Sequence, residues 1–168
     1  MAFSGLLYWL IRRQNNISAL LPPKAIRRGI SQAGVNFIKK EEGLRLDQYA
    51  DAAGFPTIGY GHKIEPPEFF PPAITEPEAE KLLRRDIARF ESSVNDLVKV
   101  PVTQNMYDAL ISLAFNIGIG ALARSTTIRL LNKGDYKGAA DAILLWKFAN
   151  KQPILLARRE RERTVFLS

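Results

Sequence analysis

The sequence contains no cysteine and only one histidine, His62. Without cysteine the chain can form neither a disulfide nor a catalytic thiolate, and a single histidine argues against a histidine-rich metal site. Its 168 residues are enough for one ordinary domain, which buries sufficient surface to need no covalent cross-link. We therefore expect a fold held together by its own core, with no metal and no cofactor.

Long apolar runs are also missing. The longest near the start, residues 5–11, falls far short of the roughly 20 residues that a membrane-spanning helix needs. A secretory signal begins with positive charge, whereas Arg12 and Arg13 follow this apolar run. Residues 1–30 are interpreted as a basic and apolar N-terminal appendage, helical in character. It suits either an interfacial amphipathic segment or one that packs back on the domain.

Acidic residues are absent from residues 1–30, which therefore carry a charge of +5, and residues 151–168 carry +3. The chain as a whole has a formal charge of +7, so its middle is close to neutral. Basic ends favour contact with a polyanion such as nucleic acid, anionic lipid or an acidic cell wall. They equally suit a solvated surface that keeps the protein soluble.

Helix-capping signals organise the rest of the chain. Ser31 predicts the start of a helix that Gly43 ends, and Thr75 with Glu78 forms a capping box for a helix reaching about residue 98. Between them, residues 44–64 carry the punctuated short runs of a β-hairpin or small sheet. Four prolines then predict a stiff extended loop over residues 65–73.

Further helices are predicted over residues 103–116 and 122–131, then from residue 135, and from residue 153 to about residue 167. The expected fold class is α+β and mostly α. A small β-lobe at residues 44–64 and a larger helical lobe at residues 75–168 flank a cleft, within one domain over residues 31–168. Clefts between lobes are where ligands usually bind.

Glu42, Asp51 and Thr57 suit the acid-assisted cleavage of a glycosidic bond. That reaction needs a proton for the leaving oxygen and a nucleophile on the opposite face, and the donor must be a carboxylic acid with a raised pKa. Glu42 ends a helix, where negative partial charge disfavours a carboxylate, so we expect it to keep its proton. Asp51, on a more open turn, should stay ionised and orient a water that the Thr57 hydroxyl also holds.

Taken singly, each of these residues also has an ordinary structural explanation. Glu42 suits a solvated helix end paired with Arg45, Asp51 suits a turn, and Thr57 suits a strand. The evidence for a shared catalytic role comes instead from the order and spacing of the three residues.

The stretch from Glu42 to His62 reads E-G-L-R-L-x-x-Y-x-D-x-x-G-x-x-T-I-G-Y-G-H. It resembles the catalytic segment of the phage-type lysozymes, the T4 lysozyme-like endolysin family of glycoside hydrolases. Similar motifs continue through F-N-I-G at residue 115 and R-R-x-x-E-R at residue 158, so the resemblance covers roughly residues 31–168. It implies a lysozyme-like fold and an N-acetylmuramidase that cuts the β-1,4 bond between N-acetylmuramic acid and N-acetylglucosamine in peptidoglycan, causing lysis of the bacterial host.

By this resemblance Glu42 is the general acid, Asp51 and Thr57 position the water, and the anomeric configuration inverts. No metal or cofactor is implied. Several other polar residues are candidates for contacts with substrate or for structural roles beside the site. The substrate-binding candidates are Tyr60, Asn116, Ser125 and Thr126. His62 is expected to form structural hydrogen bonds across the lobe junction, and Arg45 to pair with a carboxylate of the site.

The arginines at 158, 159 and 163 have two interpretations. They suit contacts with the carboxylates of a peptide stem, and they suit the solvated face of an amphipathic helix.

The protein is expected to act as a monomer on peptidoglycan, without binding nucleic acid. It should accumulate in the host cytoplasm and reach the periplasmic wall after the membrane is permeabilised. Residues 1–30 are a candidate contact with an anionic outer-membrane surface. Two alternatives remain at this stage: a lytic transglycosylase, which needs only the acid, and a membrane-active cationic protein.

Overall fold

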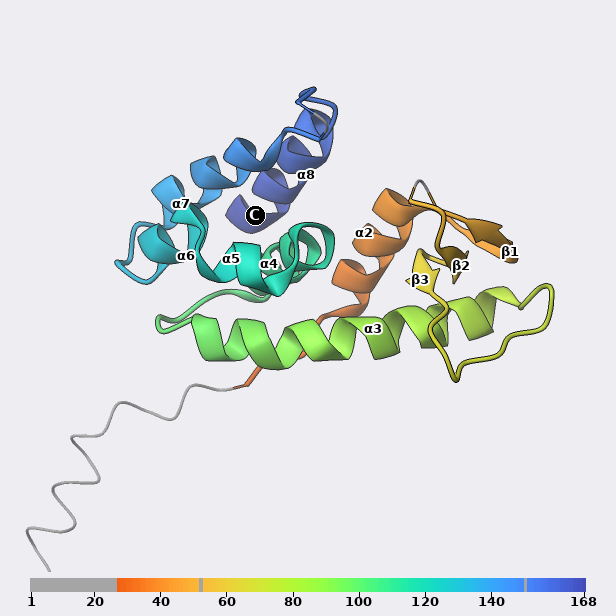
Figure 1. Cartoon of the computed structure of the whole chain (residues 1–168). Coiled ribbons are helices and arrows are strands. Elements are labelled where there is room, and N and C mark those ends of the chain that lie inside the picture. Colours follow the sequence, from red (N-terminus) through yellow and green to blue (C-terminus); the bar gives the residue numbers. More distant parts are fainter. Residues whose placement is uncertain (1–26, 52, 150) are drawn as a thin grey trace, which may run out of the picture.

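The computed structural model describes residues 27–51, 53–149 and 151–168. Most of the predicted appendage, residues 1–26, lies outside the described residues. Within the described part, a small sheet and a set of helices are joined by one long helix, which runs beneath both (Figure 1). This is the predicted α+β, mostly helical arrangement.

Helix α2 (Gln32–Glu42) begins and ends where its capping residues predict. The Ser31 hydroxyl accepts a hydrogen bond from the Gly34 N–H at 3.1 Å. At the other end Gly43 has φ of +72°, a left-handed conformation that glycine adopts without steric cost, and it stops the helix at Glu42. The sequence therefore places Glu42 on the last turn of a helix that packs against α4.

The small sheet has three antiparallel strands in the order β1 (Arg45–Ala50), β2 (Pro56–Gly59) and β3 (His62–Lys63). The register pairs Tyr49 with Thr57, and Thr57 with Lys63. Thr57 consequently lies on the central strand, between Tyr49 of β1 and Lys63 of β3.

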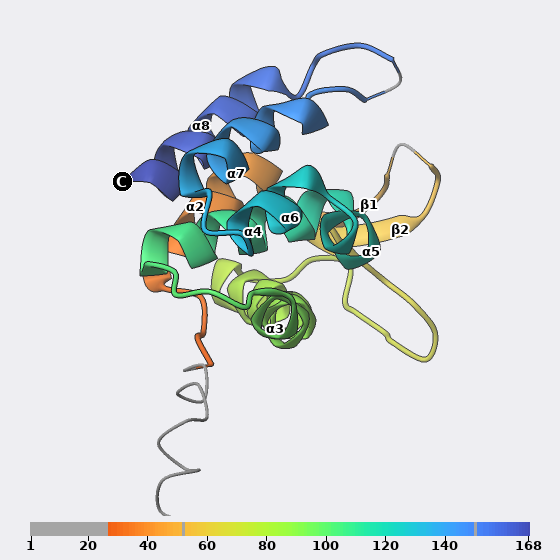
Figure 2. The ribbon, with the colours of Figure 1, turned by 90° about the vertical axis from the view of Figure 1, so that its left-hand side faces the viewer.

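Helix α3 (Glu76–Leu97) starts at the predicted capping box, in which the Glu78 carboxylate accepts the Thr75 N–H at 2.7 Å. In Figure 2, where α3 is seen end-on, the remaining helices lie on one side of it. These are α4 (Gln104–Ile117), α5 (Ile119–Ala123), α6 (Thr126–Leu131), α7 (Tyr136–Ile143), the short 3-10 helix η1 (Leu144–Trp146) and α8 (Leu156–Leu167).

One helix prediction is wrong in detail. The segment predicted as a single helix over residues 122–131 is divided into α5 and α6. The division falls at Ser125, whose hydroxyl accepts the Ile128 N–H at 3.1 Å and so begins a new helix.

The core lies where α2, α3, α4, α7 and α8 meet, and α4 is its centre. Eight consecutive residues of α4, from Tyr107 to Ala114, are buried. A helix that is buried on all sides needs neighbours on all sides, and α2, α3 and α8 provide them. The C-terminal end of α4 therefore comes close to both α2 and α8.

None of the helices among the described residues has the length and apolar character that crossing a membrane requires.

Candidate active site

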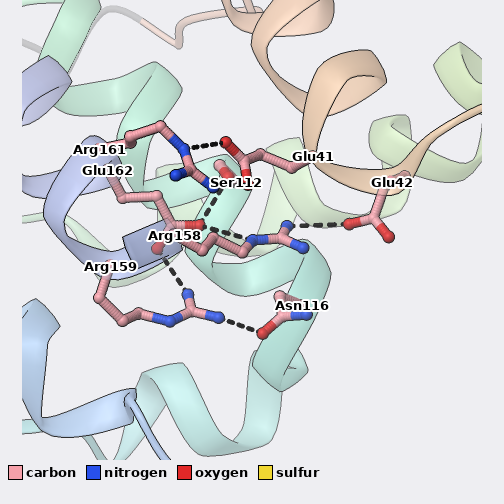
Figure 3. Close-up of polar contacts among 8 residues, drawn as sticks. All are labelled: Glu41, Glu42, Ser112, Asn116, Arg158, Arg159, Arg161 and Glu162. Carbon is pink, nitrogen blue, oxygen red and sulfur yellow. Dashed lines mark hydrogen bonds and ion pairs between the residues drawn. The ribbon is translucent and has the colours of Figure 1, made fainter. Parts of the chain in front are cut away.

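Glu42 is held in place by a residue from the far end of the chain. Its Oε1 accepts a hydrogen bond from Nη2 of Arg158, on α8, at 2.8 Å, and the glutamate side chain is 20 % exposed (Figure 3). The carboxyl group therefore does not point freely into bulk solvent. The contact with Arg158 fixes the orientation of this carboxyl group at the end of α2.

Asp51 lies in the turn that follows β1. Its Oδ1 accepts the backbone N–H groups of Ala53 at 2.8 Å and Phe55 at 2.9 Å, and Lys63 lies 3.3 Å from Oδ2. The Phe55 N–H is the main cause that lowers the pKa of Asp51; burial opposes it, while Ala53 and Lys63 add to the lowering. Asp51 is therefore an anion at neutral pH.

Thr57 is tied to Asp51 through one intervening residue. The Thr57 hydroxyl donates to the carbonyl oxygen of Phe55 at 2.9 Å, while the Phe55 N–H donates to Asp51. Thr57 is 2 % exposed, and its donated hydrogen leaves the oxygen lone pairs free to accept from another donor. The hairpin thus presents an anion and a hydroxyl acceptor in one fixed arrangement.

A group of buried charged residues lies behind Glu42 (Figure 3). Glu162 of α8 is fully buried and contacts Arg158, Arg159 and Ser112. Burial raises the pKa of Glu162, against the opposing effects of Arg159, Ser112 and Arg158. For Arg158 and Arg159, the interpretations as contacts to a peptide stem and as a solvated helix face are both wrong. Their guanidinium groups bind Glu162, Glu42 and Asn116 inside the protein.

Two of the four substrate-binding candidates have little surface to offer a sugar. Tyr60 is 4 % exposed, and its hydroxyl lies 3.3 Å from an oxygen of Glu76. Ser125 is 5 % exposed and caps α6. Tyr60 thus packs in the core and Ser125 caps a helix, and a contact of either side chain with substrate stays a prediction.

Asn116 and Thr126 remain candidates. Asn116 is exposed at the C-terminal end of α4, where its Oδ1 accepts from Arg159, and this leaves its amide N–H groups available. Thr126, partly exposed, is the first residue of α6.

His62 connects three segments. Its Nδ1 lies 2.7 Å from Asp86 of α3, and its Nε2 lies 3.0 Å from Glu68 in the loop after β3. Arg45 does not contact a carboxylate of the site: it pairs with Asp47 at 2.9 Å on the exposed face of β1. That expectation is wrong because alternate residues of a strand share a face, which brings Arg45 next to Asp47.

A hollow of about 580 Å³ lies beside β3 and the loop that follows it, against α3. Its lining comes from both sides, with Gly61 and Lys63 from the sheet, Arg89 and Phe90 from α3, and Phe115 from α4. The loop over residues 65–68 completes the lining, and Glu42, Asp51 and Thr57 do not contribute to it. Such a volume is within the range of small-ligand sites.

Among the residues that the structure describes, no cluster of histidine and carboxylate side chains has the composition of a metal site.

Sequence reasoning missed Glu162, Ser112 and Lys63. The first two are 50 residues apart, and no local pattern links them. Lys63 had a visible signal, because in a three-stranded antiparallel hairpin it pairs with Thr57 and so lies beside the turn of Asp51.

Comparison with known proteins gives consistent similarities. Residues 39–162 match the family model described as phage lysozyme. The endolysin of Salmonella phage P22 is 50 % identical over 143 residues, covering 83 % of this chain and 98 % of that protein.

Among solved structures, a P22 lysozyme mutant aligns with a TM-score of 0.78 and 48 % identity, covering 84 % of this chain and 99 % of the other. The muramidase domain of SpmX from Asticaccaulis excentricus aligns with a TM-score of 0.76 and 40 % identity, over 84 % and 99 % of the two chains.

Proposed function

Because this chain belongs to the phage lysozyme family and is a glycoside hydrolase of the bacterial cell wall, we propose how its site residues divide the reaction. Its substrate is peptidoglycan, and the proposed target is the β-1,4 bond between N-acetylmuramic acid and N-acetylglucosamine. The comparisons favour neither a lytic transglycosylase nor a purely membrane-active protein.

Glu42 is the proposed proton donor. The observation that carries this assignment is the position of its carboxyl group, which is partly buried at the C-terminal end of α2 and fixed by Arg158 at 2.8 Å. A fixed and partly desolvated carboxyl group can deliver its proton to the glycosidic oxygen as the bond to the anomeric carbon breaks.

Asp51 and Thr57 are proposed to hold the attacking water. The Asp51 anion accepts one hydrogen of this water and takes that proton as the new C–O bond forms, while Thr57 accepts the other hydrogen. Asp51 also stabilises the positive charge that develops on the sugar ring. Attack by water on the face opposite the leaving oxygen inverts the anomeric configuration.

Replacement of Glu42 tests this assignment. Glu42→Gln keeps the side-chain shape but cannot donate a carboxylic proton, and we expect clearing of purified peptidoglycan to slow by about 100- to 10,000-fold. Glu41→Gln is the matched control, because Glu41 is the adjacent residue and its carboxylate contacts Arg161 instead. Rapid clearing by Glu42→Gln would refute the assignment.

The route to the wall is a separate part of the proposal. The protein accumulates in the host cytoplasm and acts as a monomer on the periplasmic wall once the membrane is permeabilised. The charge of +5 on residues 1–30 supports attraction to an anionic outer-membrane surface. Full-length protein should then kill intact Gram-negative cells faster than a truncation lacking these residues, and equal killing would exclude this role.

A further inference from the structure

One buried carboxylate, that of Glu162, contacts the two arginines that hold Glu42 and Asn116. Glu162 is 0 % exposed, and its Oε1 accepts from the Ser112 hydroxyl at 2.7 Å and from Nε of Arg158 at 3.2 Å. Its Oε2 accepts from Nη1 of Arg159. Guanidinium groups can only donate, so both carboxylate oxygens act as acceptors, as they do in the ionised form.

Each arginine then extends beyond Glu162 to a residue of the site (Figure 3). Arg158 uses its Nη2 to bind Glu42 at 2.8 Å, and Arg159 uses its Nη2 to bind Oδ1 of Asn116. The i,i+4 and i,i+3 spacings on α8 bring both guanidinium groups to the same carboxylate. The planar guanidinium group, with its several donors, is suited to bridging two acceptors in this way.

We propose that Glu162 is a positioning residue: through Arg158 it fixes the proton donor Glu42, and through Arg159 it fixes Asn116 at the C-terminal end of α4. This proposal rests on the proposed function, because it assumes that Glu42 gives the proton. It assigns a role to a carboxylate that does not touch substrate.

Glu162 also affects the electrostatic potential at Glu42. Arg158 faces Glu42 from α8, with Arg159 and Arg161 behind it, and Arg161 is paired with Glu41. The one charged residue of α4, Asp108, lies at the other end of α2, where it accepts from the Ser31 N–H at 3.0 Å. Glu162 is therefore the anion that offsets Arg158, and without it the positive potential at Glu42 would promote loss of the catalytic proton.

Glu162→Gln tests both consequences. The amide nitrogen cannot accept from arginine, so we expect kcat to fall about 10- to 100-fold because Glu42 is misplaced. KM should rise because Asn116 is no longer held. The alkaline limb of the pH–rate profile should move to lower pH, since Glu42 would lose its proton more readily. Glu160→Gln is the matched control, with the same substitution at an exposed position of the same helix.

A pH–rate profile equal to that of the wild type would overturn the proposal. A fall in activity that matches a smaller amount of folded protein would not count in its favour. Should Glu162→Gln fail to fold, Arg158→Lys decides the question. Lysine keeps the charge but cannot bridge Glu42 and Glu162 as the guanidinium does, so kcat should fall about tenfold or more. Wild-type kcat and pH profile in this variant would overturn the proposal.

The proposed function fails separately. Full activity of Glu42→Gln would refute the assignment of the proton donor. An inactive Glu42→Gln together with a Glu162→Gln that behaves like Glu160→Gln would refute only the positioning role.

Discussion

The two sides of the site are held by different means. Asp51 and Thr57 are fixed by contacts that stay within residues 49–63, on a hairpin with an exposed turn. Glu42 is fixed by Arg158, 116 residues away in the chain, and by charges buried under the helical lobe. The first arrangement depends on local backbone geometry, whereas the second depends on the packing of α8 against α4.

Among variants of the hairpin, Asp51→Asn should have the largest effect on catalysis. The amide cannot take a proton from water, and we expect kcat to fall about 100-fold or more. The urea midpoint should change little, because the turn keeps its backbone hydrogen bonds. Measurement of kcat and of urea unfolding on the same preparation checks this separation. A large loss of stability would show that the hairpin is not the local unit described above.

Arg159→Met should have the reverse pattern, a large loss of stability with a smaller effect on kcat. It leaves the fully buried Glu162 without one of its two cations, and breaking such a pair is expected to cost about 3 kcal/mol or more in the free energy of unfolding. Arg163→Met on the same helix is the control, because the partner of Arg163, Asp141, is 42 % exposed and so is not left buried without a cation. Equal urea midpoints for the two variants would contradict the importance of the buried charges.

Gly54→Ala tests the local geometry around Asp51. Gly54 has φ of +85° with no atom near the added methyl group, so the substitution costs about 1–2 kcal/mol through backbone strain alone. Gly134→Ala is matched, with φ of +80° and equally open surroundings after α6. Both should lower the melting temperature similarly, but only Gly54→Ala should lower kcat. Equal kcat in the two variants would argue against a fixed turn.

Lys63→Gln should have the smallest effect. The pKa of Asp51 is lowered mainly by the Phe55 N–H and less by Lys63, so removing the lysine should raise that pKa slightly. Because Asp51 must be ionised to act, the acid limb of the pH–rate profile should then move to higher pH. A shift to lower pH would contradict the contact between Lys63 and Asp51.

The same contrast explains what the sequence could predict. Ser31, Gly43 and the capping box at Thr75 fix helix ends through contacts three or four residues apart, and these predictions are confirmed. Ser125 carries an equally local signal, a serine before two threonines, yet the prediction ran one helix through it.

The two arginines of α8 show where such reasoning stops. Arg45 pairs with Asp47 through the alternation of a single strand, whereas the partners of Arg158 and Arg159 lie on α2 and α4. Local patterns indicate an amphipathic helix from residue 153 to about residue 167, but only tertiary packing decides that Arg158 and Arg159 are buried.

The central claim is that both sides of the site act together, with Glu42 giving a proton and the hairpin delivering a water. Digestion of purified peptidoglycan in ¹⁸O-labelled water, followed by mass spectrometry of the fragments, tests it most directly. The account predicts one ¹⁸O atom at each new reducing end of N-acetylmuramic acid. Anhydro ends without ¹⁸O would contradict it, because they would show cleavage in which Asp51 and Thr57 deliver no water.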